Sequence, residues 1–438
     1  MTESLRKLDI RHLWHPYTEI SSMEKRAFPI IERAEGVYLY DTDGRPILDG
    51  ISSWWACALG HGHPRVVEAI REQASRLQHS ILGGMSHPGA IRLAEDICEL
   101  TPPGLNHVFF ASDGASAVEA ALKIAIQYRA NLGQDGRSSF ISLADGYHGD
   151  TLGAVGVGFL PHFHSAFAGA VRQSYRAESP YCLRCPAGRS PGDCKLECFQ
   201  SMEGLIRKHH QSVAAVIVEP LCQAAAGVRI YPADYLRRLR ALCDEYGLLL
   251  IADEIAVGFG RTGAMFACDK AGISPDIMCL GKALTAGYLP MSATVVSDEV
   301  YDSFRSDGGR DRAFYHGHTF CGNPIAAAAA RAALAEYRER NIVQRIQPLV
   351  EKLRAGMSSF EELDCVRGVR TLGMIGMMEL QGKASAPGVA SRALELGLFI
   401  RPLGAAVYLW PPLVTTKQEL ERMLSILSQA VAEAPLPR

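Results

Sequence analysis

A lysine and a carboxylate, each placed directly after a run of apolar residues, are the groups in this sequence most suited to chemistry. Lys282 follows residues 277–281, and Asp253 follows residues 248–252. Burial at the end of a strand lowers the pKa of a lysine ammonium, and the free amine condenses with an aldehyde to give a Schiff base. A carboxylate can keep a pyridine nitrogen protonated, so that the ring accepts electrons. Together the two residues indicate an enzyme that uses pyridoxal 5'-phosphate.

Each of these residues also has a simpler interpretation. Lysines are usually solvated, so Lys282 taken alone could be a surface residue. Asp253 and Glu254 could be helix caps or a solvated pair, although acids that follow five buried apolar residues need partners. A strand-end carboxylate followed by a strand-end lysine favours the catalytic interpretation.

Two further segments suit the same cofactor. Residues 112–116 (Ser-Asp-Gly-Ala-Ser) join a predicted strand to a predicted helix, whose first turn exposes backbone N–H groups that can bind a phosphate at Gly114 and Ala115. An ordinary helix cap is the alternative. Tyr147 lies in the glycine-containing turn 146–149, where an aromatic ring could lie flat on a cofactor; a core aromatic is the alternative.

The elements that must position these residues alternate along the chain. Helical patterns, such as residues 64–77, 115–128 and 324–337, alternate with strands. This alternation predicts an α/β fold with a mixed, mostly parallel sheet and helices on both faces, and ligands bind beyond the carboxyl ends of such strands. The predicted strands are residues 107–111, 138–143, 214–218, 248–252, 277–280 and 292–296.

The length of 438 residues allows more than one domain. We expect an N-terminal arm at residues 1–60, with a hairpin at residues 37–49, that packs with a small domain. Residues 61–337 then form a large cofactor-binding domain, and residues 338–438 form the smaller α+β domain.

The composition excludes several classes of partner. The chain is 48% hydrophobic and 21% charged, with a formal net charge of −2 and no long basic run, so nothing favours nucleic acid or an anionic membrane. Apolar runs are shorter than the roughly 20 residues of a membrane span, and the first residues lack the apolar core of a secretion signal. We expect a cytoplasmic protein whose partners are small molecules.

Four of the twelve cysteines stand apart from the rest. Cys182 and Cys185, followed by Cys194 and Cys198, enclose a loop rich in proline and glycine at about residues 180–200. Such spacing makes them weak candidates for a zinc site, and a surface insertion with free or packed thiols is the alternative. No other metal site is expected.

Several motifs resemble those of the class III, fold-type I aminotransferases, and the resemblance covers nearly the whole chain. Within the class, residues 14–18, Trp54 with Trp55, and residues 400–404 look like the branch that aminates 8-amino-7-oxononanoate in biotin synthesis. The motifs shared with the class are residues 52–55, 146–151, 252–263, 280–284 and 317–324.

The resemblance implies a role for each matching residue that binds the cofactor. Lys282 forms the covalent link to pyridoxal phosphate, Asp253 pairs with the pyridine nitrogen, and Tyr147 lies at the ring face. Backbone groups of Gly114 and Ala115 hold the phosphate. The resemblance further implies that His318 and Thr319 complete the phosphate site of a neighbouring subunit, so that the active unit is a homodimer with shared active sites.

The resemblance also implies the substrate site and the substrates. Arg401 suits a carboxylate, because a guanidinium binds it through two parallel hydrogen bonds, and Trp54 offers an apolar wall for a methylene chain. The implied substrates are 8-amino-7-oxononanoate and an amino donor, S-adenosyl-L-methionine or lysine. The implied substrate-binding residues are Tyr17, Trp54, Tyr147, Lys282, Gly317 and Arg401.

Two departures from the family pattern bear on specificity. His318 stands where the best-known members carry proline, and residues 224–226 are alanines where many relatives have glycine. The same segment lacks the second glutamate of ornithine and 4-aminobutyrate aminotransferases, which argues against those two substrates. Three alternatives remain: an ω-aminotransferase for a diamine or a β-amino acid, a glutamate-1-semialdehyde-type mutase, and a cofactor-binding regulator without turnover.

Overall fold

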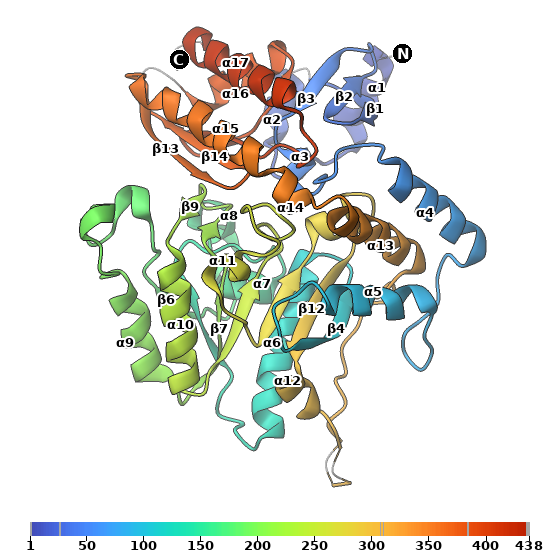
Figure 1. The fold of residues 1–438 in the computed structure, drawn as a ribbon, viewed down its shortest axis with the longest axis vertical. Helices are drawn as coiled ribbons and strands as arrows, with labels where there is room; N and C mark the ends of the chain where they lie inside the picture. The colour runs from blue at the N-terminus through green and yellow to red at the C-terminus, as the bar shows by residue number, and fades with distance from the viewer. Residues whose placement is uncertain (1, 26–27, 307, 310, 383–384, 435–438) are drawn as a thin grey trace.

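A seven-stranded sheet forms the centre of the larger part of the molecule (Figure 1). The computed structural model describes residues 2–25, 28–306, 308–309, 311–382 and 385–434. Strand β12 runs opposite to the other six strands of this sheet, so the sheet is mixed and mostly parallel, and the predicted fold class is confirmed. In spatial order the strands are β4 (Leu105–Ala111), β12 (Ser292–Ser297), β11 (Ile277–Leu280), β10 (Leu249–Asp253), β7 (Val213–Val218), β5 (Ser139–Leu143) and β6 (Tyr175–Ala177).

The central strands are buried on both faces, as expected for a sheet covered by helices. In β11, Ile277 and Cys279 pack on the side of helix α6 (Gly114–Asn131), whereas Met278 and Leu280 pack with the group that contains α13 (Pro324–Glu339). The alternation follows from the two-residue period of a strand. Because β10 and β11 are parallel, the residues that follow Asp253 and Leu280 leave the sheet at the same edge.

The helices surround this sheet and continue into the upper part of Figure 1. Besides α6 and α13 they are α1 (Thr2–His12), α2 (Ile20–Lys25), α3 (Ser52–Trp55), α4 (Pro64–Arg76), α5 (Pro88–Cys98), α7 (Leu152–Val157), α8 (Pro161–His164), α9 (Phe199–His209), α10 (Ala233–Glu245), α11 (Ala267–Ala271), α12 (Asp298–Asp302), α14 (Ile342–Arg345), α15 (Gln347–Ser358), α16 (Ala386–Glu395) and α17 (Lys417–Glu433).

Within the described residues, three smaller sheets accompany the large one. One joins the N-terminal segment to the C-terminal one, because β3 pairs in parallel with β15, far along the chain. The sheets are β1 (Ile31–Glu35), β2 (Tyr38–Asp41), β3 (Pro46–Asp49) and β15 (Leu398–Phe399); β13 (Val366–Leu372), β14 (Ile375–Leu380), β17 (Ala406–Leu409) and β16 (Pro402–Leu403); and β8 (Cys222–Gln223) with β9 (Arg229–Ile230).

The predicted elements differ from the observed ones mainly at their ends. The strand expected at residues 248–252 spans Leu249–Asp253, so Asp253 is the last strand residue rather than the first loop residue. The hairpin expected at residues 37–49 is β2 with β3. Strand β6 was not predicted, because three residues carry too little pattern. The division into domains at residues 60 and 337 stays a prediction.

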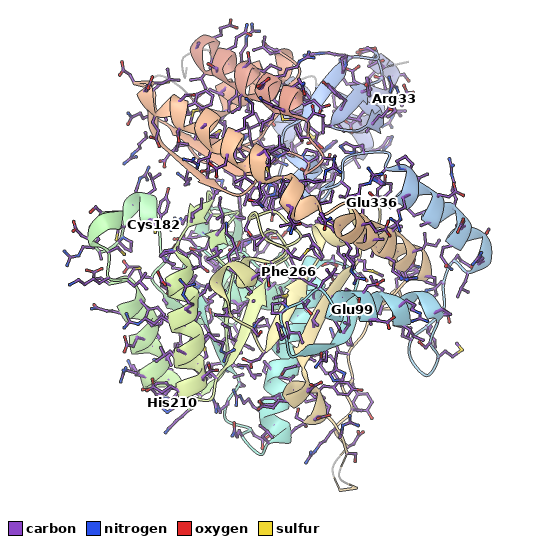
Figure 2. All side chains as sticks on the ribbon, viewed as in Figure 1. Arg33, Glu99, Cys182, His210, Phe266 and Glu336 are labelled. Carbon is purple, nitrogen blue, oxygen red and sulfur yellow. The ribbon has the colours of Figure 1, made fainter. Side chains whose placement is uncertain are left out.

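Side chains in Figure 2 fill the space between these elements, with Phe266 in the interior and Cys182 near the outer edge. Among the residues described, none of the helices combines the length and the apolar character that crossing a membrane requires.

Truncation of a central strand residue should destabilise the whole protein. Ile277 in β11 is fully buried, and replacing isoleucine by alanine at such a site costs about 2–5 kcal/mol. We expect Ile277→Ala to lower the free energy of unfolding by about 3 kcal/mol, measured by urea titration. Leu132→Ala, at a position that is 50% exposed, is the control and should change it by less than about 1 kcal/mol.

Candidate active site

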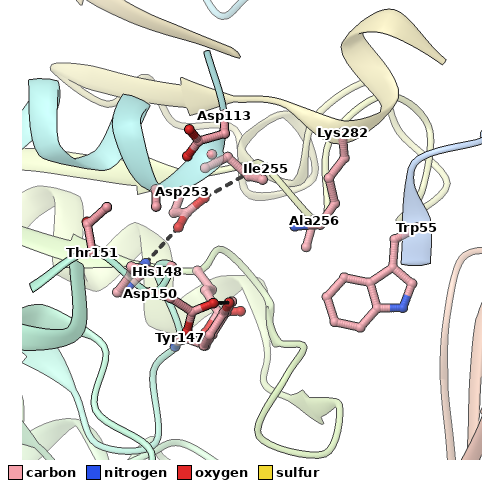
Figure 3. A pocket seen from close by; sticks show the side chains of 14 residues that line it. Trp55, Asp113, Tyr147, His148, Asp150, Thr151, Asp253, Ile255, Ala256 and Lys282 are labelled. Carbon is pink, nitrogen blue, oxygen red and sulfur yellow. Dashed lines mark hydrogen bonds and ion pairs between the residues drawn. The ribbon is translucent and has the colours of Figure 1, made fainter. Parts of the chain in front are cut away.

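A cavity of about 500 Å³ opens at the carboxyl edge of the large sheet (Figure 3). The segments that follow β4, β5, β7, β10 and β11 all contribute to its wall, as expected for an α/β sheet. Its lining includes Trp55, Asp113, Gly114, Ala115, Tyr147, His148, Gly149, Asp150, Thr151, Glu219, Asp253, Ile255, Ala256 and Lys282.

Lys282 is held in the cavity by an unusual backbone conformation. Its φ of +44° lies in the left-handed region directly after Gly281, and it opens the short 3₁₀ helix Lys282–Thr285. Among the described residues, none forms a hydrogen bond or an ion pair with Nζ, which lies 5.3 Å from the ring centroid of Trp55. Burial lowers the pKa of the Lys282 ammonium, although Asp253 opposes this effect. The amine is therefore available in its nucleophilic form more readily than a solvated lysine.

Asp253 lies across the cavity from Lys282 and is fixed by two hydrogen bonds. His148 Nδ1 donates to Asp253 Oδ2 at 2.7 Å, and the Ile255 N–H donates to Oδ1 at 3.1 Å. Burial opposes a charge on His148, but the hydrogen bond to Asp253 and the negative charges of Asp253 and Glu219 together outweigh burial and raise the pKa of the imidazole. A buried, ion-paired carboxylate at this point is suited to hold a protonated ring nitrogen.

The neighbouring acid Glu254 points elsewhere and does not belong to the site. Its two oxygens accept the backbone N–H groups of Ala267 and Cys268 at 3.0 and 2.8 Å, at the start of α11. Burial raises the pKa of Glu254 to about 7. The helix-cap interpretation therefore holds for Glu254, whereas Asp253 lines the cavity.

The start of α6 leaves backbone donors free to face the cavity. Asp113 caps this helix by accepting the Ser116 N–H at 3.0 Å, and among the described residues no acceptor takes the N–H of Gly114 or Ala115. The buried Thr151 hydroxyl in the same cavity wall also lacks a partner within the described residues. These orphaned donors, with the helix dipole, fit a phosphate group.

Tyr147 joins a network that the sequence did not predict. The Tyr147 N–H donates to Glu219 at 3.0 Å, and its hydroxyl donates to Asp150 Oδ2 at 2.9 Å. The hydroxyl of Tyr17 donates to Asp150 Oδ1 at 2.6 Å. Burial, followed by the bond to Asp150, raises the pKa of Tyr17 to about 12, so this phenol stays protonated. Burial also raises the pKa of Glu219 to about 7.

A second cavity of about 710 Å³ adjoins the first and shares Trp55, Tyr147, Asp150 and Lys282 with it. Tyr17, Trp54 and Arg401 also line it, so the residues named here come from five segments far apart in the sequence. The Arg401 guanidinium lies 4.5 Å from the centroid of the Trp54 ring, and Tyr17 contacts that ring edge-on at 5.5 Å. The Arg401 guanidinium, the apolar ring of Trp54 and the Asp150 carboxylate therefore line the same cavity.

Three of the predicted residues lie outside both cavities within a single chain. Gly317 and Thr319 are exposed, and His318 Nδ1 lies 3.4 Å from the Ser112 hydroxyl, next to the start of α6. The functional residues that the sequence analysis missed are His148, Asp150 and Glu219. His148 and Asp150 lie in the motif around Tyr147, and Glu219 directly follows the predicted strand 214–218, but these positions alone did not indicate their roles.

The four clustered cysteines are remote from this chemistry. Burial, then the neighbouring thiols, raise the pKa of Cys182 and of Cys198 to about 11. Within the described ranges, no three histidine, cysteine or acidic side chains are arranged to hold a metal ion. The insertion that carries these cysteines is tied to β14 by the ion pair between Arg184 and Glu379.

This fold and site define a class of enzyme. The chain belongs to the class III aminotransferases, because the family model for aminotransferase class III matches residues 20–431, which confirms the resemblance. Enzymes of this class use pyridoxal 5'-phosphate, so the chain does too, and the free donors beside Asp253 and Lys282 fit that group.

Individual members of the class are similar to this chain over nearly its whole length. The chain is 39% identical over 442 residues to the adenosylmethionine-8-amino-7-oxononanoate aminotransferase of Geobacter sulfurreducens, covering 98% of each protein. It is 39% identical over 454 residues to the enzyme of that name from Methanocaldococcus jannaschii, covering 99% of this chain and 98% of the relative.

Solved structures agree with the sequence relatives. The crystal structure of the Methanocaldococcus jannaschii enzyme superposes with a TM-score of 0.94 at 38% identity, over 100% of both chains. The omega transaminase of Pseudomonas jessenii, solved in complex with PMP, superposes with a TM-score of 0.93 at 30% identity, over 98% of both chains.

A methyl group at Gly149 should damage the proposed phosphate site. Gly149 has φ +117°, and a Cβ there would lie 2.4 Å from Cβ of Ala115. Because the start of α6 must then shift, we expect Gly149→Ala to weaken pyridoxal phosphate binding by about 10-fold or more, measured by equilibrium dialysis. Gly169→Ala is the matched control, since a Cβ at Gly169 meets nothing within 4 Å. Equal affinity in both variants would contradict this placement.

Proposed function

We propose that this chain converts 8-amino-7-oxononanoate to 7,8-diaminononanoate in biotin biosynthesis, with S-adenosyl-L-methionine as the amino donor. The observation that carries the proposal is the second cavity, where Arg401 and Asp150 face the same space as Lys282. The acceptor has a carboxylate at one end and a ketone beside an amine at the other, so it requires both a cation and an anion in its site.

Each end of the acceptor has a chemically matched group. Arg401 binds the carboxylate through parallel hydrogen bonds, and Trp54 covers the methylene chain. Asp150 binds the ammonium group beside the ketone, because its carboxylate lines the second cavity and is oriented there by the hydroxyls of Tyr17 and Tyr147. This assignment places the ketone carbon toward Lys282.

Pyridoxal phosphate supplies an aldehyde that carries the amino group and a protonated ring that takes up negative charge. Asp253, oriented by His148, holds the ring proton, and the Gly114 and Ala115 N–H groups hold the phosphate. Lys282 anchors the group covalently at Nζ. When it is free, Nζ would take the proton from the substrate carbon that bears nitrogen and pass it to the carbon of the cofactor's aldehyde, so that the amine is left unchanged.

The proposal extends to assembly and location. We propose a homodimer in which Gly317, His318 and Thr319 of one subunit reach the site of the other. Their position outside the cavities of their own chain supports this, as do the exposed aromatic rings of Tyr315 and Phe320 on the same segment, which are 81% and 61% exposed. We also propose a cytoplasmic location, where S-adenosyl-L-methionine is available.

A panel of donors and acceptors tests the function. Purified protein should aminate 8-amino-7-oxononanoate with S-adenosyl-L-methionine, and with lysine at a rate lower by about 10-fold or more. Product formation is measured by mass spectrometry. Preferred amination of a simple diamine's oxo partner, which has no carboxylate for Arg401, would favour a general ω-aminotransferase instead.

The anchoring role of Lys282 has a separate test. Borohydride reduction of the holoenzyme should label Lys282, and Lys282→Ala should lower turnover by about 10⁴-fold or more while still binding pyridoxal phosphate noncovalently. Lys208→Ala, at an exposed position on α9, is the control and should keep wild-type turnover. Label on any other lysine, or turnover in Lys282→Ala, would refute the role.

A further inference from the structure

The segment Ser52–Trp55 is the most strained stretch of backbone in the cavity wall. Four consecutive residues other than glycine, with φ of +50°, +43°, +67° and +72°, form one left-handed turn. The left-handed conformation costs about 1–2 kcal/mol per residue, so the surrounding structure must hold the turn in place.

Hydrogen bonds to two buried groups, the Asp49 carboxylate and the Trp410 carbonyl, hold this turn. Asp49, fully buried at the end of β3, accepts the hydroxyl of Ser53 at 2.7 Å and Nε2–H of His61 at 2.9 Å. On the other side, the Ser52 hydroxyl donates to the Trp410 carbonyl at 2.7 Å.

The pairing of Asp49 with His61 is a charged one at neutral pH. Burial opposes a charge on His61, but the hydrogen bond to Asp49 and the neighbouring Cys57 outweigh it and raise the pKa of His61 to about 9. A charge-assisted bond is roughly twice as strong as a neutral one, and its loss would leave Asp49 buried without a cationic partner.

The turn determines where both tryptophans lie. Trp54 projects to Arg401 at 4.5 Å and to Tyr17 at 5.5 Å, whereas Trp55 stacks on Trp410 at 4.7 Å. A right-handed or extended backbone at residues 52–55 would direct the side chain of Trp54 elsewhere, so the strained turn is a condition for the apolar wall beside Arg401.

We propose that Asp49 and His61 are positioning residues for the acceptor: they hold the left-handed turn of residues 52–55 and, through it, the contact of Trp54 with Arg401. Neither residue lines the two cavities, so they act through the turn and not by touching the substrate. This inference rests on the proposed function for its substrate, 8-amino-7-oxononanoate.

The test compares His61→Leu with the conservative His61→Gln in the holoenzyme. We expect His61→Leu to raise KM for 8-amino-7-oxononanoate by about 10-fold, the loss of one charge-assisted bond, and to leave kcat and cofactor content within about 2-fold of wild type. His61→Gln keeps an N–H donor for Asp49 and should restore KM to within about 3-fold. General destabilisation would instead lower kcat and cofactor content together.

Two further variants keep the test decisive. Ser53→Ala removes one hydrogen bond of Asp49 without changing charge, and should raise KM by about 3-fold even if His61→Leu fails to fold. His107→Leu is the control, because His107 forms a more exposed pair with Asp298 at 3.0 Å outside both cavities, and it should leave KM unchanged.

A crystal structure of His61→Leu, or of Ser53→Ala if the first does not fold, separates this inference from the proposed function. Ser53 and Trp54 should leave the left-handed region and Trp54 should move from Arg401, while Trp55 stays stacked on Trp410. A turn that keeps all four positive φ values, or a KM that stays at the wild-type value, overturns the inference. If the wild-type enzyme does not aminate 8-amino-7-oxononanoate, the proposed function fails, and the conformation of the turn alone decides the inference.

Discussion

The site depends on two adjacent parallel strands: β10 ends with the buried acid Asp253, and Lys282 opens the short helix that follows β11. Strands β10 and β11 pair so that Asp253 lies opposite Cys279, three residues before Lys282. Without that register, the carboxylate and the amine would not face one cavity. Burial lowers the pKa of Lys282, and the Asp253 carboxylate accepts a hydrogen bond from His148 at 2.7 Å.

The active site also depends on backbone conformations that side chains rarely adopt. Lys282 and the residues of the turn at Ser52–Trp55 all have positive φ, and Gly149 has no room for a Cβ. Such strain is expected where a surrounding fold holds functional groups in fixed positions. The sheet supplies that rigidity on the cofactor side, and the β3 to β15 pairing supplies it on the substrate side.

Features that depend on the local pattern of apolar and polar residues could be predicted from the sequence. Apolar runs located the strands of the large sheet, and their ends located Asp253 and Lys282. The partners of these residues were not predictable, because His148 and Asp253 are 105 positions apart and their contact arises from packing. The roles of Asp150 and Glu219 likewise depend on loops that converge only in the fold. The resemblance supplied the substrate residues, and the structure brings Tyr17, Trp54 and Arg401 together, while Gly317 and Thr319 lie outside the cavities.

The parallel pairing of β3 with β15 has a consequence for synthesis on the ribosome. The strands that carry Asp253 and Lys282 emerge well before residue 398, so a nascent chain can complete the large sheet first. The wall formed by Trp54 cannot meet Arg401 until almost the entire polypeptide has been translated. The cofactor site can therefore form before the substrate site. Early binding of pyridoxal phosphate would stabilise an incomplete chain by mass action.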